Sequence, residues 1–204
     1  MDGHPGAGKT TLVNELAARG ISIIGEVVSA AGQVVEDYGR EVGSPEETLA
    51  NMPMVLASDL TKHRLAREFS KSQLVVMDRN YVFTLGVSLT LGMMMREDVF
   101  FDAYRWFNRN RVELVVPDAY IVLDLPVELS DERTGWQPCN PGNPMTFVEL
   151  RRIVAAYSDA FRRVREPLCP VHHLDATRSV EATVSSALSI ISEHSARSSN
   201  DSQR

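Results

Sequence analysis

Short runs of apolar residues alternate with longer amphipathic segments along most of the chain. The apolar runs predict strands at Ile21–Val28, Gln73–Met77 and Ala119–Leu125, with a weaker one at Val171–Leu174. Strands buried in a parallel sheet are continuous apolar runs of this kind. The segments between them predict helices, in chain order Lys9–Arg19, Glu46–Ser70 (broken near Pro53), Asp98–Val112, Phe147–Val164 and Val180–His194. This order predicts an α/β fold in which helices cover both faces of a parallel sheet.

The length and composition of the chain fit a single domain. Its 204 residues, 44% of them hydrophobic, can bury one sizeable core, which we expect to span residues 1–194. The segment Ser195–Arg204 is mostly Ser, Asn, Asp, Gln and Arg, so we expect a disordered tail there. Three prolines between Gly135 and Pro144 argue against a helix or strand and predict a mobile lid over about residues 134–146.

Charge and cysteine content argue against several classes of protein. The net charge is −6 and no run of Lys and Arg stands out, whereas a nucleic-acid-binding protein normally shows a basic face. No apolar run approaches the roughly 20 residues of a membrane-spanning helix. Cys139 and Cys169 have no metal-ligand spacing and suit a reducing compartment. We therefore expect a cytoplasmic protein that binds neither nucleic acid nor membrane.

The strongest chemical signal is a phosphate-binding loop near the start of the chain. Residues Gly3–Thr10 read GHPGAGKT and fit the pattern G-x-x-x-x-G-K-[ST] at every fixed position, where the alternative is a glycine-rich turn before an ordinary helix. Glycines let backbone N–H groups face phosphate oxygens, the lysine reaches the β- and γ-phosphates, and the threonine offers a hydroxyl to Mg²⁺. The dipole of the following helix favours the same anions. The residues that we predict to bind ATP are Gly3, Pro5, Gly6, Ala7, Gly8, Lys9, Thr10 and Thr11.

One feature of the loop is unusual. A P-loop follows a buried strand, and here only Met1 and Asp2 precede Gly3. Loss of a central strand would cost more than the roughly 5–15 kcal/mol by which a domain is stable. We therefore expect that the first strand is missing or truncated and that the native chain carries several more apolar residues before Met1.

Two further strands end in charged residues that suit the same chemistry. Asp78 and Arg79 follow the apolar run Leu74–Met77, and Glu26 closes the run that begins at Ile21. The C-terminal ends of parallel strands form the crevice in which such sheets bind ligands. There Asp78 can hold Mg²⁺ directly or through water, Arg79 can grip phosphoryl oxygens, and Glu26 can deprotonate or orient an attacking hydroxyl. The alternatives are a surface turn at Asp78 and an exposed strand-end glutamate.

The ordered series of motifs resembles the thymidylate kinase and deoxynucleoside kinase superfamily over almost the whole chain. The matching segments are Asp2–Thr11, Ala57–His63, Val76–Asn80, Pro117–Asp118, Leu123–Glu128 with Arg133, the helix positions Phe147, Arg151 and Tyr157, and His173–Thr177. The resemblance implies a three-layer P-loop NTPase fold, ATP with Mg²⁺ as cofactors, an arginine-bearing lid and a homodimer. Of these motifs only the P-loop is highly specific alone, and the order of the series carries the resemblance.

Departures from the superfamily pattern bear on the acceptor. Thymidylate kinases carry an arginine in the helix before the Asp-Arg strand and an Arg-Glu-Pro run after the second strand; here these positions hold Leu60 and Gly25–Val27. An acceptor phosphate brings about two negative charges, and burying them without cations is prohibitive. The two absent arginines therefore favour a neutral acceptor hydroxyl with Glu26 as base, as in deoxynucleoside kinases.

The sequence as a whole predicts an ATP-dependent kinase that transfers the γ-phosphate to a hydroxyl of a nucleoside or similar small molecule. Two alternatives stay open: a nucleoside-monophosphate kinase, and a regulatory module that binds ATP and has no acceptor. Thr10 and Asp78 are the expected Mg²⁺ ligands. The predicted catalytic residues are Lys9, Glu26, Asp78, Arg79 and, from the lid, Arg133.

Overall fold

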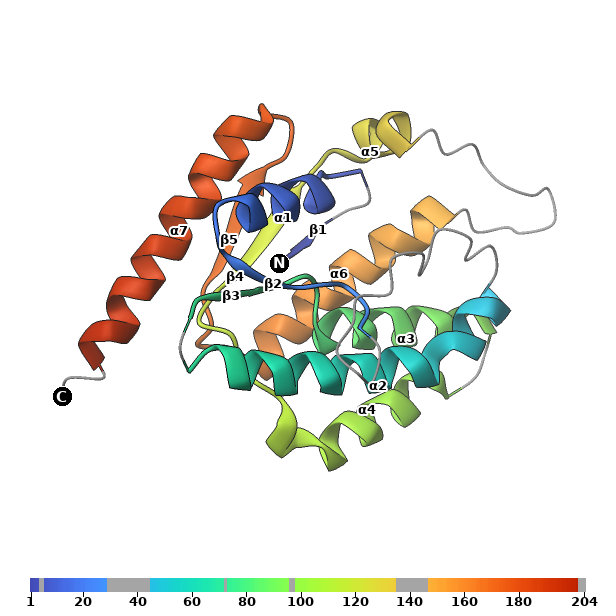
Figure 1. Cartoon of the computed structure of the whole chain (residues 1–204). Coiled ribbons are helices and arrows are strands. Elements are labelled where there is room, and N and C mark those ends of the chain that lie inside the picture. Colours follow the sequence, from blue (N-terminus) through green and yellow to red (C-terminus); the bar gives the residue numbers. More distant parts are fainter. Residues whose placement is uncertain (4–5, 29–44, 72, 96–97, 135–146, 202–204) are drawn as a thin grey trace.

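The structure is a computed structural model that describes residues 1–3, 6–28, 45–71, 73–95, 98–134 and 147–201 (Figure 1). The strands are β1 (Asp2–Gly3), β2 (Ser22–Ile24), β3 (Val75–Met77), β4 (Tyr120–Asp124) and β5 (Val171–Asp175). The helices are α1 (Lys9–Ala18), α2 (Pro45–Phe69), α3 (Tyr81–Met95), α4 (Val99–Arg109), the 3₁₀ turn η1 (Arg111–Glu113), α5 (Val127–Thr134), α6 (Phe147–Arg165) and α7 (Val180–Asp201). None of the described helices is long and apolar enough to cross a membrane.

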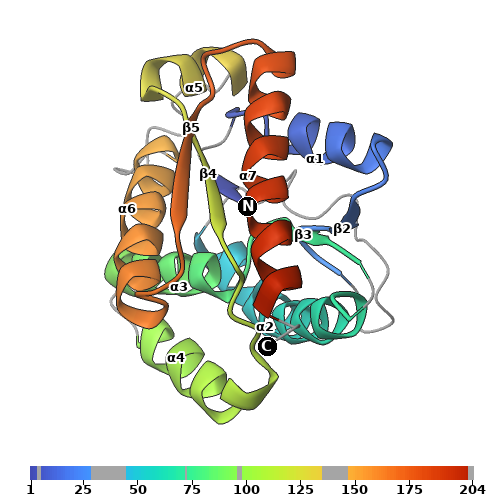
Figure 2. The same ribbon diagram turned by 90° about the vertical axis from the view of Figure 1, so that its left-hand side faces the viewer.

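Strand β4 shows how helices cover both faces of the sheet. Its side chains alternate between faces, as in any strand. Ile121 and Leu123 pack in a core cluster with residues of α1 and α7, such as Leu12 and Ala187. Tyr120 packs in a second cluster with residues of α3 and α4. Figure 2 accordingly shows α1 and α7 on one side of β4, and α3 and α6 on the other. The predicted three-layer arrangement is therefore present.

The strands form two parallel sheets, where we predicted one. Strand β4 lies between β1 and β5, while β2 pairs with β3 alone. The backbone of Met1 connects the sheets, because its nitrogen donates to Met77 O over 2.7 Å and its oxygen accepts from the Arg79 amide over 2.8 Å. Strand β1 is present but only two residues long, and a truncation of the native first strand stays a prediction.

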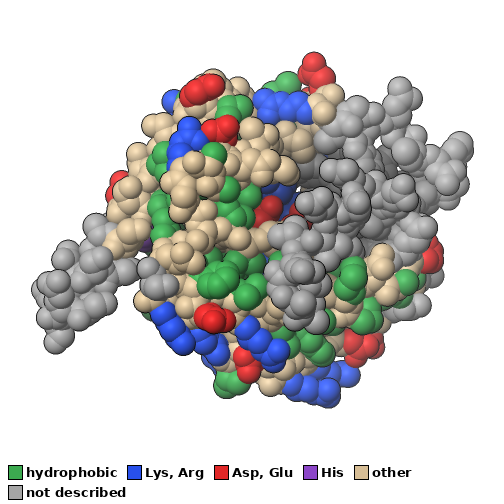
Figure 3. Space-filling view, viewed as in Figure 1, with side chains coloured by type: hydrophobic (Ala, Val, Ile, Leu, Met, Phe, Trp, Pro, Cys, Tyr) green, Lys and Arg blue, Asp and Glu red, His purple; other side chains and the backbone are tan. Residues whose placement is uncertain are grey.

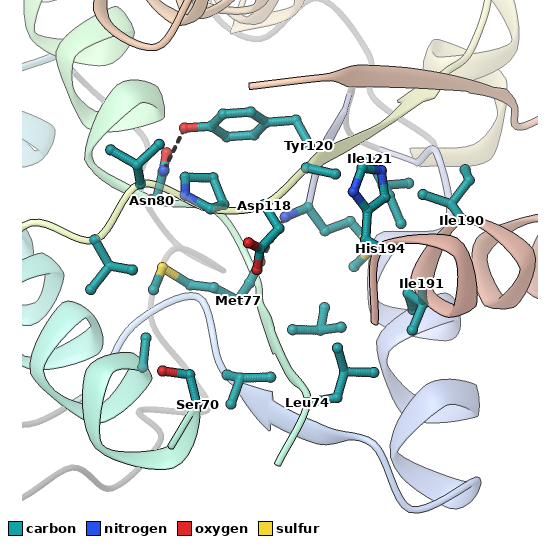
Figure 4. A pocket seen from close by; sticks show the side chains of 18 of the residues that line it. Ser70, Leu74, Met77, Asn80, Asp118, Tyr120, Ile121, Ile190, Ile191 and His194 are labelled. Atoms are coloured by element: carbon teal, nitrogen blue, oxygen red, sulfur yellow. Dashed lines mark hydrogen bonds between the residues drawn. The ribbon is translucent and has the colours of Figure 1, made fainter. Parts of the chain in front are cut away.

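A cavity of about 640 Å³ separates the two sheets beside β1. Figure 4 shows its lining from β3, β4 and the C-terminal half of α7, including Met77, Ile121, Ile191 and His194. Within the part of the chain that the structure describes, β1 pairs with Val122 and Leu123, and no strand lies between the earlier part of β4 and β3.

Three elements differ from prediction. Helix α3 was not predicted. Its own buried residues lie on most of its sides, so it has no polar face that would reveal a helical period in the sequence. Helix α2 is continuous through Pro53, where we expected a break. Helix α7 continues to Asp201, so the segment predicted as a disordered tail from Ser195 is helical up to that residue.

Candidate functional site

The phosphate-binding loop leads from β1 into α1. Gly8 precedes the helix with φ 85° and ψ 18°, a left-handed conformation that a side chain would strain. The Leu12 amide donates to Gly8 O over 2.9 Å, so α1 begins directly after the loop and its N-terminus adjoins the loop. Ala7 is buried, whereas Thr10 and Thr11 are exposed on the first turn of the helix. Pro5, with His4, lies outside the described residues.

The Lys9 side chain folds back over the loop. It is only 8% exposed, and its ammonium donates to Gly3 O over 2.9 Å. Burial, and then the charge of Arg79, lower the pKa of Lys9 to about 8. The carboxylates that oppose this shift are those of Asp2, Glu26 and Asp78. These charges can act on Lys9 only because the loop and the ends of β2 and β3 converge.

The ends of β2 and β3 bring Glu26 and Arg79 together. The two strands pair in parallel register, and the Asp78 amide donates to Ile24 O over 2.8 Å just beyond them. The Arg79 guanidinium donates to the Glu26 carboxylate and lies 3.9 Å from the centre of the Phe83 ring. Burial alone would lower the pKa of Arg79, but the carboxylates of Glu26, Asp2 and Asp78 outweigh it and raise that pKa, so Arg79 stays charged. Glu26 itself is exposed and open to a bound molecule.

Asp78 has the chemistry of a cation ligand. It is buried, and its Oδ1 atom has no hydrogen-bond partner among the described residues. A buried carboxylate oxygen without a partner is costly unless a cation or an ordered water binds it. Mg²⁺ typically uses one or two protein oxygens and completes its shell with waters and substrate phosphates. The described residues contain no cluster of three His, Cys, Asp or Glu side chains that could hold a metal ion.

Lys62 was not predicted as a site residue, yet it contacts both strand ends. It lies on α2, is 1% exposed, and donates to the backbone oxygens of Glu26 (2.9 Å), Asp78 (2.7 Å) and Arg79 (2.9 Å). Burial lowers its pKa, against the opposing charges of Asp59, Asp78 and Glu26. In the sequence, Lys62 stood out only as part of Ala57–His63, a segment that resembles the corresponding helix of the superfamily.

A second unpredicted contact ties β1 to α6. The Arg162 guanidinium is almost fully buried and donates to Asp2 Oδ2 over 2.6 Å, while Asp2 Oδ1 accepts from the Gly3 amide over 2.8 Å. Arg162 also pairs with Asp159 and lies 4.7 Å from the centre of the Tyr120 ring. Helix α6 is therefore fixed to the strand that leads into the phosphate loop.

Arg133 also contacts the phosphate loop. It lies in the last turn of α5, and its guanidinium donates to Gly6 O over 3.3 Å and to Ala176 O over 3.0 Å. The lid that we predicted after it lies almost wholly outside the described residues. Arg133, which directly precedes the predicted lid, is a described cation that contacts the phosphate loop.

Figure 3 shows acidic and basic side chains meeting in a recess near the middle of this face of the molecule. The cavity of Figure 4 is a different feature, because hydrophobic residues form much of its wall. The charged group consists of Asp2, Lys9, Glu26, Asp78 and Arg79. Asp2 and Arg79 also line the cavity, whereas the other three residues of the group do not. We therefore place the candidate site at the charged group and not in the cavity.

Comparisons with known proteins agree with this fold. A family model described as an AAA domain matches residues 1–136. The structure is similar to deoxyadenosine kinase from M. mycoides with bound dATP, with a TM-score of 0.63 and 16% identity over 93% of this chain and 96% of that one. The same enzyme with the products dCMP and a flexible dCDP gives a TM-score of 0.62 and 15% identity over 95% and 100% of the chains. The same enzyme with bound dCTP gives a TM-score of 0.60 and 14% identity over 95% of this chain and 100% of that one.

No curated protein sequence matches the chain significantly. At such low identity the structural likeness establishes the fold, which is that of a deoxynucleoside kinase, and leaves the activity to be argued from the residues of the site.

Proposed function

The chain belongs to the AAA-domain family, and from that premise we propose that it is an ATP-dependent kinase that transfers the γ-phosphate to a hydroxyl of a nucleoside or similar small molecule. One observation carries the proposal. An exposed carboxylate, Glu26, is held by Arg79 at the strand ends that face the phosphate-loop lysine, Lys9. A protein that only binds nucleotide has no need of a base on the acceptor side of the loop.

The nucleotide side of the site follows from the loop. The N–H groups at the start of α1 and the Lys9 ammonium bind the β- and γ-phosphates of ATP. Thr10 and Asp78 would hold Mg²⁺, which neutralises phosphate charge when bound. The unpartnered Asp78 Oδ1 supports that assignment.

The acceptor side uses Glu26 and two arginines. Glu26 orients the acceptor hydroxyl and takes its proton as the oxygen bonds to the γ-phosphorus and the bond to the β,γ-bridging oxygen breaks, which leaves ADP. Arg79 and Arg133 stabilise the charge that spreads over the migrating phosphoryl group. Arg79 follows the end of β3, and Arg133 lies in the last turn of α5 with its guanidinium at Gly6 O.

The charges around Glu26 favour a neutral acceptor. Leu60, at the position where thymidylate kinases carry an arginine, is buried and supplies no cation. A monophosphate brought to this place would meet a carboxylate in addition to the phosphates of ATP, and like charges at such distances repel.

A transfer screen tests the proposal. Labelled ATP is offered with Mg²⁺ and, in parallel, with thymidine, deoxyadenosine, deoxycytidine, their 5′-monophosphates or simple alcohols. We expect label to appear on a nucleoside and not on a monophosphate. Label on a monophosphate alone would replace the proposal by a nucleoside-monophosphate kinase. Slow ATP hydrolysis that no acceptor stimulates would replace it by a regulatory ATP-binding module. A cytoplasmic location and a homodimer remain predictions.

A further inference from the structure

A single buried ammonium, that of Lys62, holds both strand ends that carry the acceptor-side residues. An ammonium has three N–H donors and no acceptor. In Lys62 all three donors go to backbone oxygens, those of Glu26, Asp78 and Arg79. Beyond Ile24 and Met77, where β2 and β3 end, such oxygens have no partner from the strand ladder. Lys62 thus supplies hydrogen bonds to the backbone beyond the point where the pairing of β2 with β3 ends.

The surroundings of Lys62 hold it in this place. The Asp59 Oδ1 atom, one turn earlier on α2, lies 3.9 Å from its ammonium, and Asp59 Oδ2 accepts a hydrogen bond from Thr84 of α3 over 2.5 Å. Burying an ammonium is unfavourable, and here three hydrogen bonds to backbone oxygens offset that cost. What those three bonds hold in place gives the reason for a buried charge.

The backbone at Arg79 supplies that reason. Its φ of 57° is left-handed, which is unfavourable for a residue with a side chain. Lys62 binds the carbonyls before and after the α-carbon of Arg79, so it holds the turn that aims the guanidinium at Glu26. The same ammonium fixes the peptide of Glu26 from the neighbouring strand.

We propose that Lys62 is a positioning residue for phosphoryl transfer, which sets the separation and orientation of Glu26, Asp78 and Arg79 without touching the substrates. This inference rests on the proposed function, since the three residues are aligned for that reaction. It predicts that removal of the ammonium misplaces the acceptor side and leaves the phosphate loop intact.

The test compares the variants Lys62→Met and Lys62→Arg with the wild type and with Lys71→Met, an exposed lysine just after α2. Transfer from ATP to thymidine and deoxyadenosine gives kcat and the KM for ATP. Hydrogen exchange gives the protection of the amides of Val28, Asp78 and Arg79, which are hydrogen-bonded at the strand ends. The Leu12 amide of α1 serves as the internal reference.

We expect Lys62→Met to lower kcat about 100-fold, the size of effect that a misplacement of about 1 Å can have. The KM for ATP should change less than kcat, because the phosphate loop and Lys9 still bind the nucleotide and only the Mg²⁺ ligand Asp78 is displaced on that side. The strand-end amides should exchange faster while Leu12 does not. Lys62→Arg keeps the charge but not three convergent donors, so its kcat should fall between those of the wild type and Lys62→Met. Lys71→Met should behave as the wild type.

Wild-type kcat and exchange in both variants would overturn the inference. So would equal loss of protection at Leu12 together with loss of nucleotide binding, because Lys62 would then serve only general stability. If Lys62→Met does not fold, Lys62→Arg decides by the same two readouts. If the wild-type protein phosphorylates no acceptor, the proposed function fails, and the exchange arm still decides whether Lys62 holds the strand ends.

Discussion

The Arg79 guanidinium donates to the Glu26 carboxylate across the ends of two adjacent parallel strands. The two residues are far apart in sequence, and the pairing of β2 with β3 brings them to the same edge of the sheet. Arg79 also lies over the Phe83 ring, which fixes the plane of the guanidinium. A carboxylate held in this way is oriented before a substrate arrives, which is what a general base requires.

The first prediction concerns Glu26, which we propose as the base. Glu26→Gln keeps the size of the side chain and removes its ability to take a proton. We expect the maximal transfer rate to fall by about 10²-fold or more, with little change in the affinity for ATP. Steady-state transfer and equilibrium binding of Mg·ATP measure the two quantities. Glu193→Gln, at an exposed site on α7, is the matched control and should behave as the wild type. Loss of ATP affinity alone would place Glu26 away from the acceptor.

The second prediction follows from the pKa of Lys9, which is lowered to about 8 in the free protein. At pH 8.5 most of the Lys9 side chains are therefore neutral. Bound phosphates favour the ammonium and return the pKa toward its ordinary value of about 10.4, so binding should take up roughly 0.7 proton per nucleotide. The uptake should vanish below about pH 7, where Lys9 is already charged. Calorimetry in buffers of different ionisation enthalpy measures it.

The control for this uptake is Lys9→Arg. A guanidinium stays protonated at every pH used, so it should bind nucleotide without taking up the proton. Equal uptake by the wild type and Lys9→Arg at pH 8.5 would show that another group titrates.

The sequence was sufficient to predict the elements whose pattern is local. The observed β2, β3 and β4 lie inside predicted apolar runs, and α1 follows the glycine-rich loop as its motif requires. The structure places Glu26, Asp78, Arg79 and Lys9 in one charged group because all four follow or adjoin the ends of parallel strands. The carboxyl ends of parallel strands meet at one edge of the sheet whatever the side chains are. An apolar run followed by a charged residue is therefore enough to predict that the charge lies at this edge.

Long-range contacts explain what the sequence did not reveal. Asp2 and Arg162 are 160 positions apart, and Arg162 has the sequence appearance of a solvated charge on an amphipathic helix. In the folded chain it is buried and contacts Asp2 of β1 and the Tyr120 ring of β4. Lys62 likewise lies among polar residues of α2 whose direction depends on which face of the helix meets the sheet. An apolar helix such as α3 gives no periodic signal at all.

The third prediction concerns Arg133. Its contacts with Gly6 O and Ala176 O place the guanidinium beside the phosphate loop. Arg133→Met should slow transfer by about 10³-fold if the residue stabilises charge on the migrating group, as arginines do in related phosphoryl transfers. The effect should lie in kcat and not in the unfolding midpoint, because Arg133 is exposed. Arg163→Met, an exposed arginine of α6, is the control. Unchanged kcat in Arg133→Met would remove this residue from the mechanism.

The fourth prediction concerns Gly86, where α3 meets α6. A Cβ atom at Gly86 would lie 2.6 Å from Ser158 Oγ and 2.9 Å from Val154 O, closer than real atoms approach. Gly86→Ala would favour the helix by roughly 0.5–1 kcal/mol at an open position, but here we expect a net loss of about 1–3 kcal/mol because the helices must move apart. Urea unfolding measures the loss. Ser158→Gly in the same chain removes the nearer contact and leaves that with the Val154 backbone, so the double variant should lose less than the sum of the two single variants. Simple additivity would mean that the two residues do not touch.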